Sequence, residues 1–111
     1  MNFKYLLAIA AATLAVSVPA TAAPDADAAM KLSKDSGCTK CHSVDKTKKG
    51  PPFQKTAAKY KGKPDAEATV YKHLTTNPKV KVDGGKEEEH DSPKTKNDAE
   101  IKNLVRWVLS R

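Results

Sequence analysis

The sequence predicts a single all-α domain, and three observations support that fold class. The chain has 111 residues, which is the length of one small domain. Apolar residues recur with helical spacing, most clearly at Ile101, Leu104, Val105, Val108 and Leu109. No window shows the sustained alternation of apolar and polar residues that is typical of a strand.

Residues 1–22 have the organisation of a signal peptide. Lys4 precedes an apolar run over residues 6–18, and a small-x-small pattern ends at Ala22. The run is shorter than the roughly 20 residues that a membrane-spanning helix needs, although an uncleaved N-terminal anchor is the alternative. We therefore expect cleavage after Ala22 and export to the periplasm, with residues 23–111 as a mature domain that has no membrane span.

Helices are expected in four segments of the mature domain. A Gly-Pro-Pro sequence at residues 50–52 breaks the chain before the second helix. Asp65 is a candidate N-cap for the third helix, and Asn97 for the fourth, where Glu100 occupies the capping-box position. The expected segments are residues 25–35, 53–60, 65–76 and 97–109.

Residues 77–96 form a long polar segment before the last helix. Val80 and Val82 are its only aliphatic residues. A loop of this length without secondary structure inside a small domain is usually functional or disordered. We therefore expect a structureless loop here and look for functional residues within it.

The charge is basic and locally concentrated. The chain has 20 Lys and Arg against 13 Asp and Glu, a net charge of +7. A lysine-rich segment can be a solvated face, or it can guide encounter with an acidic partner. Nucleic acid is a poor candidate for an exported chain without interleaved basic and aromatic residues. The lysine-rich segment contains Lys46, Lys48, Lys49, Lys55, Lys59, Lys61 and Lys63.

The apolar residues of the mature domain are too few for an ordinary core. Its aromatic residues are Phe53, Tyr60, Tyr71 and Trp107. Domains of this size usually need a staple such as a metal, a disulfide or another cross-link. A large apolar cofactor would complete the interior.

Cys38, Cys41 and His42 form a C-x-x-C-H motif, the pattern of a c-type haem attachment site. Thiols three positions apart lie on one face of a helical turn, where both can form thioethers to one porphyrin, and the adjacent histidine can bind the iron. A structural zinc site would need two further ligands at similar spacing. A thioredoxin-like redox pair would need a βαβ context, and a simple disulfide would leave His42 unexplained.

These features resemble a small bacterial class I c-type cytochrome with one haem. The resemblance implies three to five helices around one covalently attached haem c, with the first and last helices crossing. It also implies that the Pro51 carbonyl accepts a hydrogen bond from His42 Nδ1 and that Trp107 packs in the core. The matching segments are residues 37–42, 50–53, 57–60, 97–101 and 104–109.

The sequence departs from this family at the second axial ligand. Class I cytochromes usually supply a methionine from the loop before the last helix, but the chain has only Met1, which the signal peptide carries away, and Met30 on the first helix. His90 lies within a residue of the expected position, with a proline three residues later. We therefore predict that His42 and His90 are the iron ligands.

Other groups could take the place of His90. His73 lies between the apolar positions of the third helix, so we expect it on the surface. Lys94 or Lys96 could coordinate if deprotonated, although an ammonium group resists desolvation. Glutamates 87–89 could keep the loop solvated or offer a carboxylate to the free nitrogen of His90.

A haem iron with two imidazole ligands has no free position for substrate, which favours electron transfer over catalysis. We expect a periplasmic one-electron carrier, not an enzyme, with a lower reduction potential than its Met-ligated relatives. The expected partners are acidic redox proteins, including multi-haem cytochromes, and the protein is expected to be a monomer. The alternative is a haem protein that binds a gas or another small ligand at an open or weakly held sixth position.

Overall fold

The computed structural model describes residues 12, 14–17 and 23–111. The predicted signal peptide, residues 1–22, lies largely outside the described residues. Within the described residues no helix combines the length and the apolar character that crossing a bilayer requires. The helices and strands, in chain order, are α1 (Ala26–Asp35), α2 (Phe53–Tyr60), α3 (Ala66–Thr75), β1 (Lys79–Lys81), β2 (Glu87–Glu89) and α4 (Asp98–Leu109).

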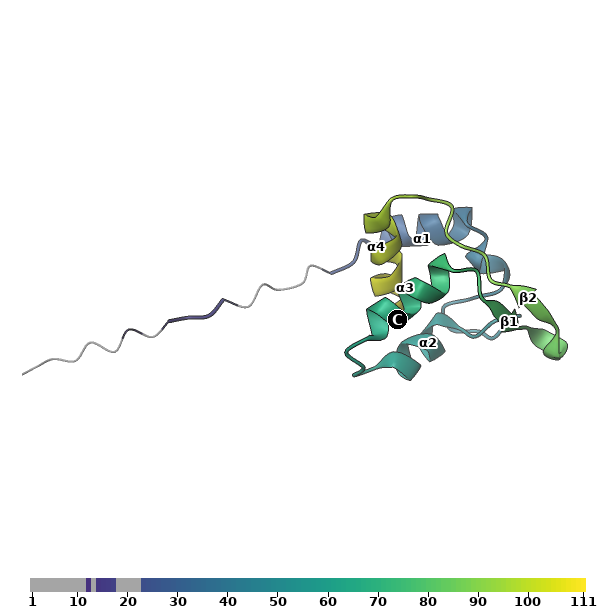
Figure 1. Ribbon diagram of the computed structural model, residues 1–111, viewed down its shortest axis with the longest axis horizontal. Coiled ribbons are helices and arrows are strands. Elements are labelled where there is room, and N and C mark those ends of the chain that lie inside the picture. The colour runs from purple at the N-terminus through teal and green to yellow at the C-terminus, as the bar shows by residue number, and fades with distance from the viewer. Residues whose placement is uncertain (1–11, 13, 18–22) are drawn as a thin grey trace, which may run out of the picture.

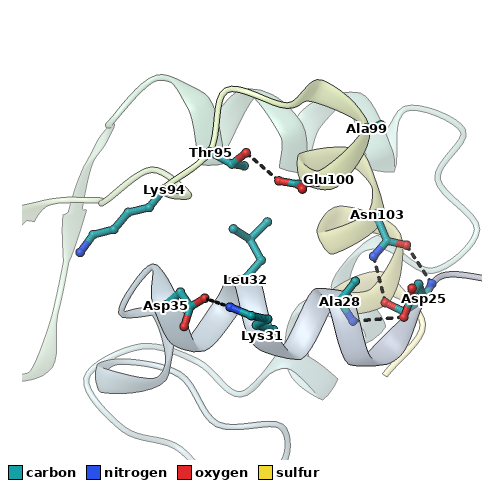
Figure 2. Close-up of a pocket in the computed structure, with 10 residues that line it drawn as sticks. All are labelled: Asp25, Ala28, Lys31, Leu32, Asp35, Lys94, Thr95, Ala99, Glu100 and Asn103. Carbon is teal, nitrogen blue, oxygen red and sulfur yellow. Dashed lines mark hydrogen bonds and ion pairs between the residues drawn. The ribbon is translucent and has the colours of Figure 1, made fainter.

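Helices α1 and α4 pack against each other with crossing axes, as the resemblance implies (Figure 1). Two hydrogen bonds fix the crossing: the Asp25 main-chain N donates to Asn103 Oδ1 at 2.8 Å, and Asn103 Nδ2 donates to the Asp25 carbonyl at 2.9 Å (Figure 2). The core lies between these helices and α2. Its centre is formed by Ala29, Phe53, Leu104, Trp107 and Val108.

The four helices lie within one residue of the expected segments, and the N-cap of α4 is confirmed. The Asn97 side chain accepts hydrogen bonds from the main-chain N of Ala99 and Glu100. The predicted capping box does not form, because the Glu100 carboxylate instead accepts a hydrogen bond from the Thr95 hydroxyl at 2.6 Å. Asp65 precedes α3 but makes no capping hydrogen bond through its side chain.

Residues 77–96 are not structureless, which corrects the sequence-based expectation. Strands β1 and β2 form an antiparallel hairpin at the edge of the molecule, away from the N-terminal end of α1 (Figure 1). Lys79 lies opposite Glu89 and Lys81 lies opposite Glu87, and such opposite charges favour strand pairing. The central pair, Val80 and Glu88, is half-buried and faces the interior.

Candidate functional site

A cavity of about 620 Å³ lies between the helices and the hairpin. Its volume is within the usual range of cofactor pockets. All of the predicted site residues line it, although they come from three separate segments of the chain: Cys38, Cys41, His42, Pro51 and His90. The structure thus brings together the residues that the sequence predicted to hold the haem, whereas the alternative ligands Lys94 and Lys96 do not line this cavity.

The two cysteines follow a turn that starts at Gly37. The φ angle of Gly37 is +78°, a conformation that glycine adopts without strain, and it directs the chain from α1 into a short 3₁₀ turn. The two thiols are free, so the disulfide alternative is not formed. Burial raises the pKa of the Cys38 thiol, which therefore stays protonated at neutral pH.

The His42 ring is held by three neighbours. Its Nδ1 lies 2.7 Å from the Pro51 carbonyl, the pairing that the resemblance implies. Because a carbonyl can only accept, Nδ1 carries the hydrogen and Nε2 keeps a free lone pair. The Phe53 ring stacks on His42 with centroids 5.4 Å apart. A Cβ at Gly50 would lie 2.6 Å from Cε1 of His42, so the ring needs a glycine there.

His90 follows strand β2 directly and lines the same cavity as His42. The two ring centroids are 6.0 Å apart and the rings are tilted by 49°. Burial lowers the pKa of His90, and the nearby His73 and His42 lower it further, so the imidazole is neutral at pH 7. Its Nδ1 is buried without a hydrogen-bond partner among the described residues, so none of glutamates 87–89 binds that nitrogen.

His73 is exposed, as predicted, and it also lines the cavity. Its ring centroid lies 4.6 Å from that of His90. Burial lowers the pKa of His73, with smaller contributions from His42 and Lys59. The expected exposure is confirmed, but α3 also turns this side of the helix toward the hairpin, which the sequence did not reveal.

The described residues offer no methionine to this cavity. Met30, the methionine among them, is 55% exposed on α1 and does not line the cavity. A second, polar groove between α1 and the start of α4 contains none of the predicted site residues (Figure 2). The histidines are therefore the strongest neutral donors that face the cavity.

Sequence reasoning missed two residues that shape the site, Gly50 and Asn77. Gly50 leaves room for the His42 ring, and Asn77 Nδ2 donates to the His90 carbonyl at 3.0 Å. The Gly-Pro-Pro sequence was a signal for a turn, but nothing local indicates the distance from Gly50 to His42. Asn77 lies 13 positions from His90, and only the hairpin brings the two together.

The cavity suits a large apolar group with a metal at its centre. Two thiols and three histidines line it. Apolar side chains from three helices also line it, as expected for a site that contacts a porphyrin face: Phe53, Val70, Leu74, Leu104 and Val108. A family model described as Cytochrome c matches residues 26–111. The chain belongs to the cytochrome c family.

Relatives and solved structures agree with this assignment. Cytochrome c-551 of Allochromatium vinosum is 36% identical over 93 residues, covering 80% of this chain and 92% of the relative. The class 1 cytochrome MtoD of Sideroxydans lithotrophicus ES-1 is 48% identical with a TM-score of 0.76, covering 79% of this chain and 97% of MtoD. Cytochrome c552 of Nitrosomonas europaea is 28% identical with a TM-score of 0.57, covering 73% and 96%.

The family assignment establishes the coarse properties of the protein. Its fold is the class I cytochrome c fold, with four helices in the described residues. The cofactor is one covalently attached haem c, and the chain has the two cysteines for it. The family consists of electron carriers, which exchange electrons with redox partners.

Proposed function

We propose that this cytochrome is a periplasmic one-electron carrier whose haem iron is bound by His42 and His90. Haem c, when bound, supplies one-electron exchange between Fe(III) and Fe(II). Cys38 and Cys41 would hold the porphyrin through thioethers. The protein would act as a carrier and not as an enzyme, because both axial positions would be occupied by protein groups.

The distance between His42 and His90 is the observation that carries the proposal. Metal–imidazole bonds are about 2 Å long, so two rings on opposite sides of one metal ion have centroids roughly 6 Å apart. The observed separation of 6.0 Å matches this requirement. Both histidines are suitable ligands. The Pro51 hydrogen bond leaves Nε2 of His42 free, and burial keeps the His90 imidazole neutral.

The missing methionine bears on the reduction potential. A thioether ligand raises the potential of a c-type haem, so a second imidazole in its place should lower it. The carrier would then work at a lower potential than its Met-ligated relatives. Such a potential suits low-potential partners such as multi-haem cytochromes.

The lysine-rich segment supports an acidic redox partner. Lys49, Lys55 and Lys59 line the cavity, so these positive charges lie beside the proposed haem site. We propose that these lysines guide encounter with an acidic protein surface. Residues 1–22, which precede the family match at residue 26, are proposed as a cleaved signal peptide and would account for export to the periplasm. The mature protein is proposed to be a monomer.

Replacement of His90 by alanine tests the ligand assignment. In the haem-loaded ferric protein, His90→Ala should convert the iron from low spin to high spin, because it removes one strong-field ligand. His73→Ala is the matched control, since it removes a neighbouring imidazole from the same cavity and should leave the iron low spin. Optical and electron paramagnetic resonance spectra measure both.

Two results would contradict the assignment. An unchanged low-spin spectrum in His90→Ala would exclude His90, and a change in His73→Ala alone would assign the ligand to His73. A high-spin wild-type protein that binds carbon monoxide rapidly when reduced would instead favour the alternative, a haem protein that binds small ligands.

A further inference from the structure

The turn between α3 and β1 holds His90 through its main chain. Asn77 Nδ2 donates to the His90 carbonyl at 3.0 Å. The His90 main-chain N donates to the Pro78 carbonyl at 2.8 Å. Both main-chain polar groups of His90 are therefore bound by two consecutive residues, and these contacts do not involve the imidazole.

Asn77 has an unusual backbone conformation. Its φ angle is +48°, and it is the one residue other than glycine with a positive φ in the described part of the chain. Asparagine tolerates this left-handed region better than most residues. The position thus requires a positive φ and a side-chain donor together, and glycine would satisfy only the first requirement.

A second anchor lies on the far side of His90. The Ser36 hydroxyl, which is buried at the end of α1, accepts a hydrogen bond from the main-chain N of Lys94 at 2.8 Å. The segment that carries His90 is therefore attached at both ends. Loss of the Asn77 contact should loosen the His90 end while the Ser36 contact keeps the segment in place.

We infer that Asn77 is a positioning residue for the sixth ligand of the haem iron. The inference rests on the proposed role of His90. Because the backbone of His90 is fixed in advance, its imidazole loses little freedom on binding and returns quickly after it dissociates. Asn77 would thereby keep the sixth position closed to external ligands.

Carbon monoxide binding to the reduced, haem-loaded protein measures this property. Carbon monoxide can bind only after the sixth ligand leaves, so at concentrations well below saturation the binding rate is set by the ratio of ligand departure to ligand return. Asn77→Asp preserves the size and the positive φ but places an acceptor against the His90 carbonyl. Asn77→Gly preserves the turn and removes the side chain. Each variant should raise the binding rate at low carbon monoxide concentration roughly three- to tenfold, as expected for one lost hydrogen bond.

Asn103→Asp is the matched control. Asn103 Nδ2 also donates to a main-chain carbonyl, that of Asp25 at 2.9 Å, but it joins α1 to α4 outside the haem cavity (Figure 2). This variant should lower the midpoint of thermal unfolding and leave the binding rate at low carbon monoxide concentration unchanged. A purely structural contribution of Asn77 would give the same pattern as Asn103.

The outcomes separate the inference from the proposed function. Wild-type rates in both Asn77 variants, together with an open site in His90→Ala, would overturn the role of Asn77 alone. A low-spin His90→Ala protein that binds carbon monoxide as slowly as the wild type would overturn the ligand assignment and the role of Asn77 with it. Faster binding in the Asn77 variants but not in Asn103→Asp would support both.

Discussion

The orientation of His42 depends on residues eight to eleven positions later in the chain as much as on the motif itself. Pro51 fixes the ring through its carbonyl, and Phe53 stacks on the ring face. Gly50 contributes by lacking a side chain, since its position lies against Cε1 and Nδ1 of His42. The ring is therefore oriented toward the cavity by the protein alone.

Gly50→Ala should disturb the proximal side of the site. The new Cβ would lie 2.6 Å from Cε1 and 3.0 Å from Nδ1 of His42, and 3.2 Å from the Cys41 carbonyl. Since a main-chain carbonyl cannot move aside as a flexible side chain can, the imidazole must shift and weaken its hydrogen bond to Pro51. We expect a lower yield of haem-loaded protein and an altered Soret band, measured by absorption spectroscopy.

Gly62→Ala provides the control. Gly62 has a φ of +76° and nothing within 4 Å of its Cβ position, so alanine there costs about 1 kcal/mol of backbone strain without touching the site. Its spectrum should equal that of the wild type. Equal spectra for both variants would show that His42 tolerates the added methyl group.

Local patterns predicted the proximal residues and could not predict all the distal ones. Cys38, Cys41 and His42 are adjacent in sequence, so their spacing alone indicates one site. His90 was predicted from its place in a family pattern, and the structure puts it in the cavity. His73 was not predicted to face it and Asn77 was not predicted to bind His90, because both contacts depend on how α3 and the hairpin pack.

Helices α3 and α4 are joined by a hydrogen-bonded surface group. The Tyr71 hydroxyl donates to Asp98 Oδ1 at 2.6 Å, and Lys102 forms an ion pair with the other carboxylate oxygen at 2.8 Å. Lys102 and then Tyr71 lower the pKa of Asp98 below its usual 3.8, while the carboxylate raises the pKa of Tyr71 above 10.0. The group is intact only while Asp98 is charged and Tyr71 is protonated.

Tyr71→Phe should lower the midpoint of thermal unfolding in a pH-dependent way. Because the pKa of Asp98 is lowered in the folded state, its carboxylate stabilises the fold fully above pH 3.8. This stabilisation is lost as the pH falls through the folded pKa. Because the pKa of Tyr71 is raised in the folded state, its protonated hydroxyl stabilises the fold fully below pH 10.0. This stabilisation is lost as the pH rises through the folded pKa. The difference between wild type and variant, measured by circular dichroism, should be largest near neutral pH and shrink toward both extremes. A difference that stays constant with pH would attribute the effect to packing instead.

The helices were predictable because each has local signals, and the hairpin was not because it has none. Breakers, an N-cap and an apolar stripe define α4 within the sequence. Strands β1 and β2 are Lys-Val-Lys and Glu-Glu-Glu, so Val80 is the single aliphatic residue among the six strand residues. They pair because opposite charges face each other across the strands and because Val80 contributes to the cavity wall.

Across the whole molecule, the position of the charges matters more than their sum. Lys55 and Lys59 lie on α2 at the cavity, whereas Lys34 lies on α1 and does not line it. Charges near the point of electron transfer act on a partner more strongly than distant ones, because salt screens interactions beyond roughly 10 Å. The molecule should therefore present a positive face around the haem.

Lys55→Glu and Lys34→Glu change the net charge equally and test this arrangement. At low ionic strength, Lys55→Glu should slow electron exchange with ferricyanide, a small anionic oxidant, by a factor of roughly two to ten, because local charge steers encounter. Lys34→Glu should change the rate less, and added salt should reduce both effects. Stopped-flow absorption measures the rates, and equal decreases in the two variants would contradict a local role.

The proximal half of the site has a consequence for biosynthesis. The groups that orient His42 lie within a short stretch of chain, from Gly37 to Phe53, whereas His90 and its anchor at Asn77 come much later. Contacts between near neighbours form faster than contacts between distant ones. An attachment enzyme could therefore join the porphyrin to the early segment while the remainder is still unfolded, and the hairpin would close over it afterwards.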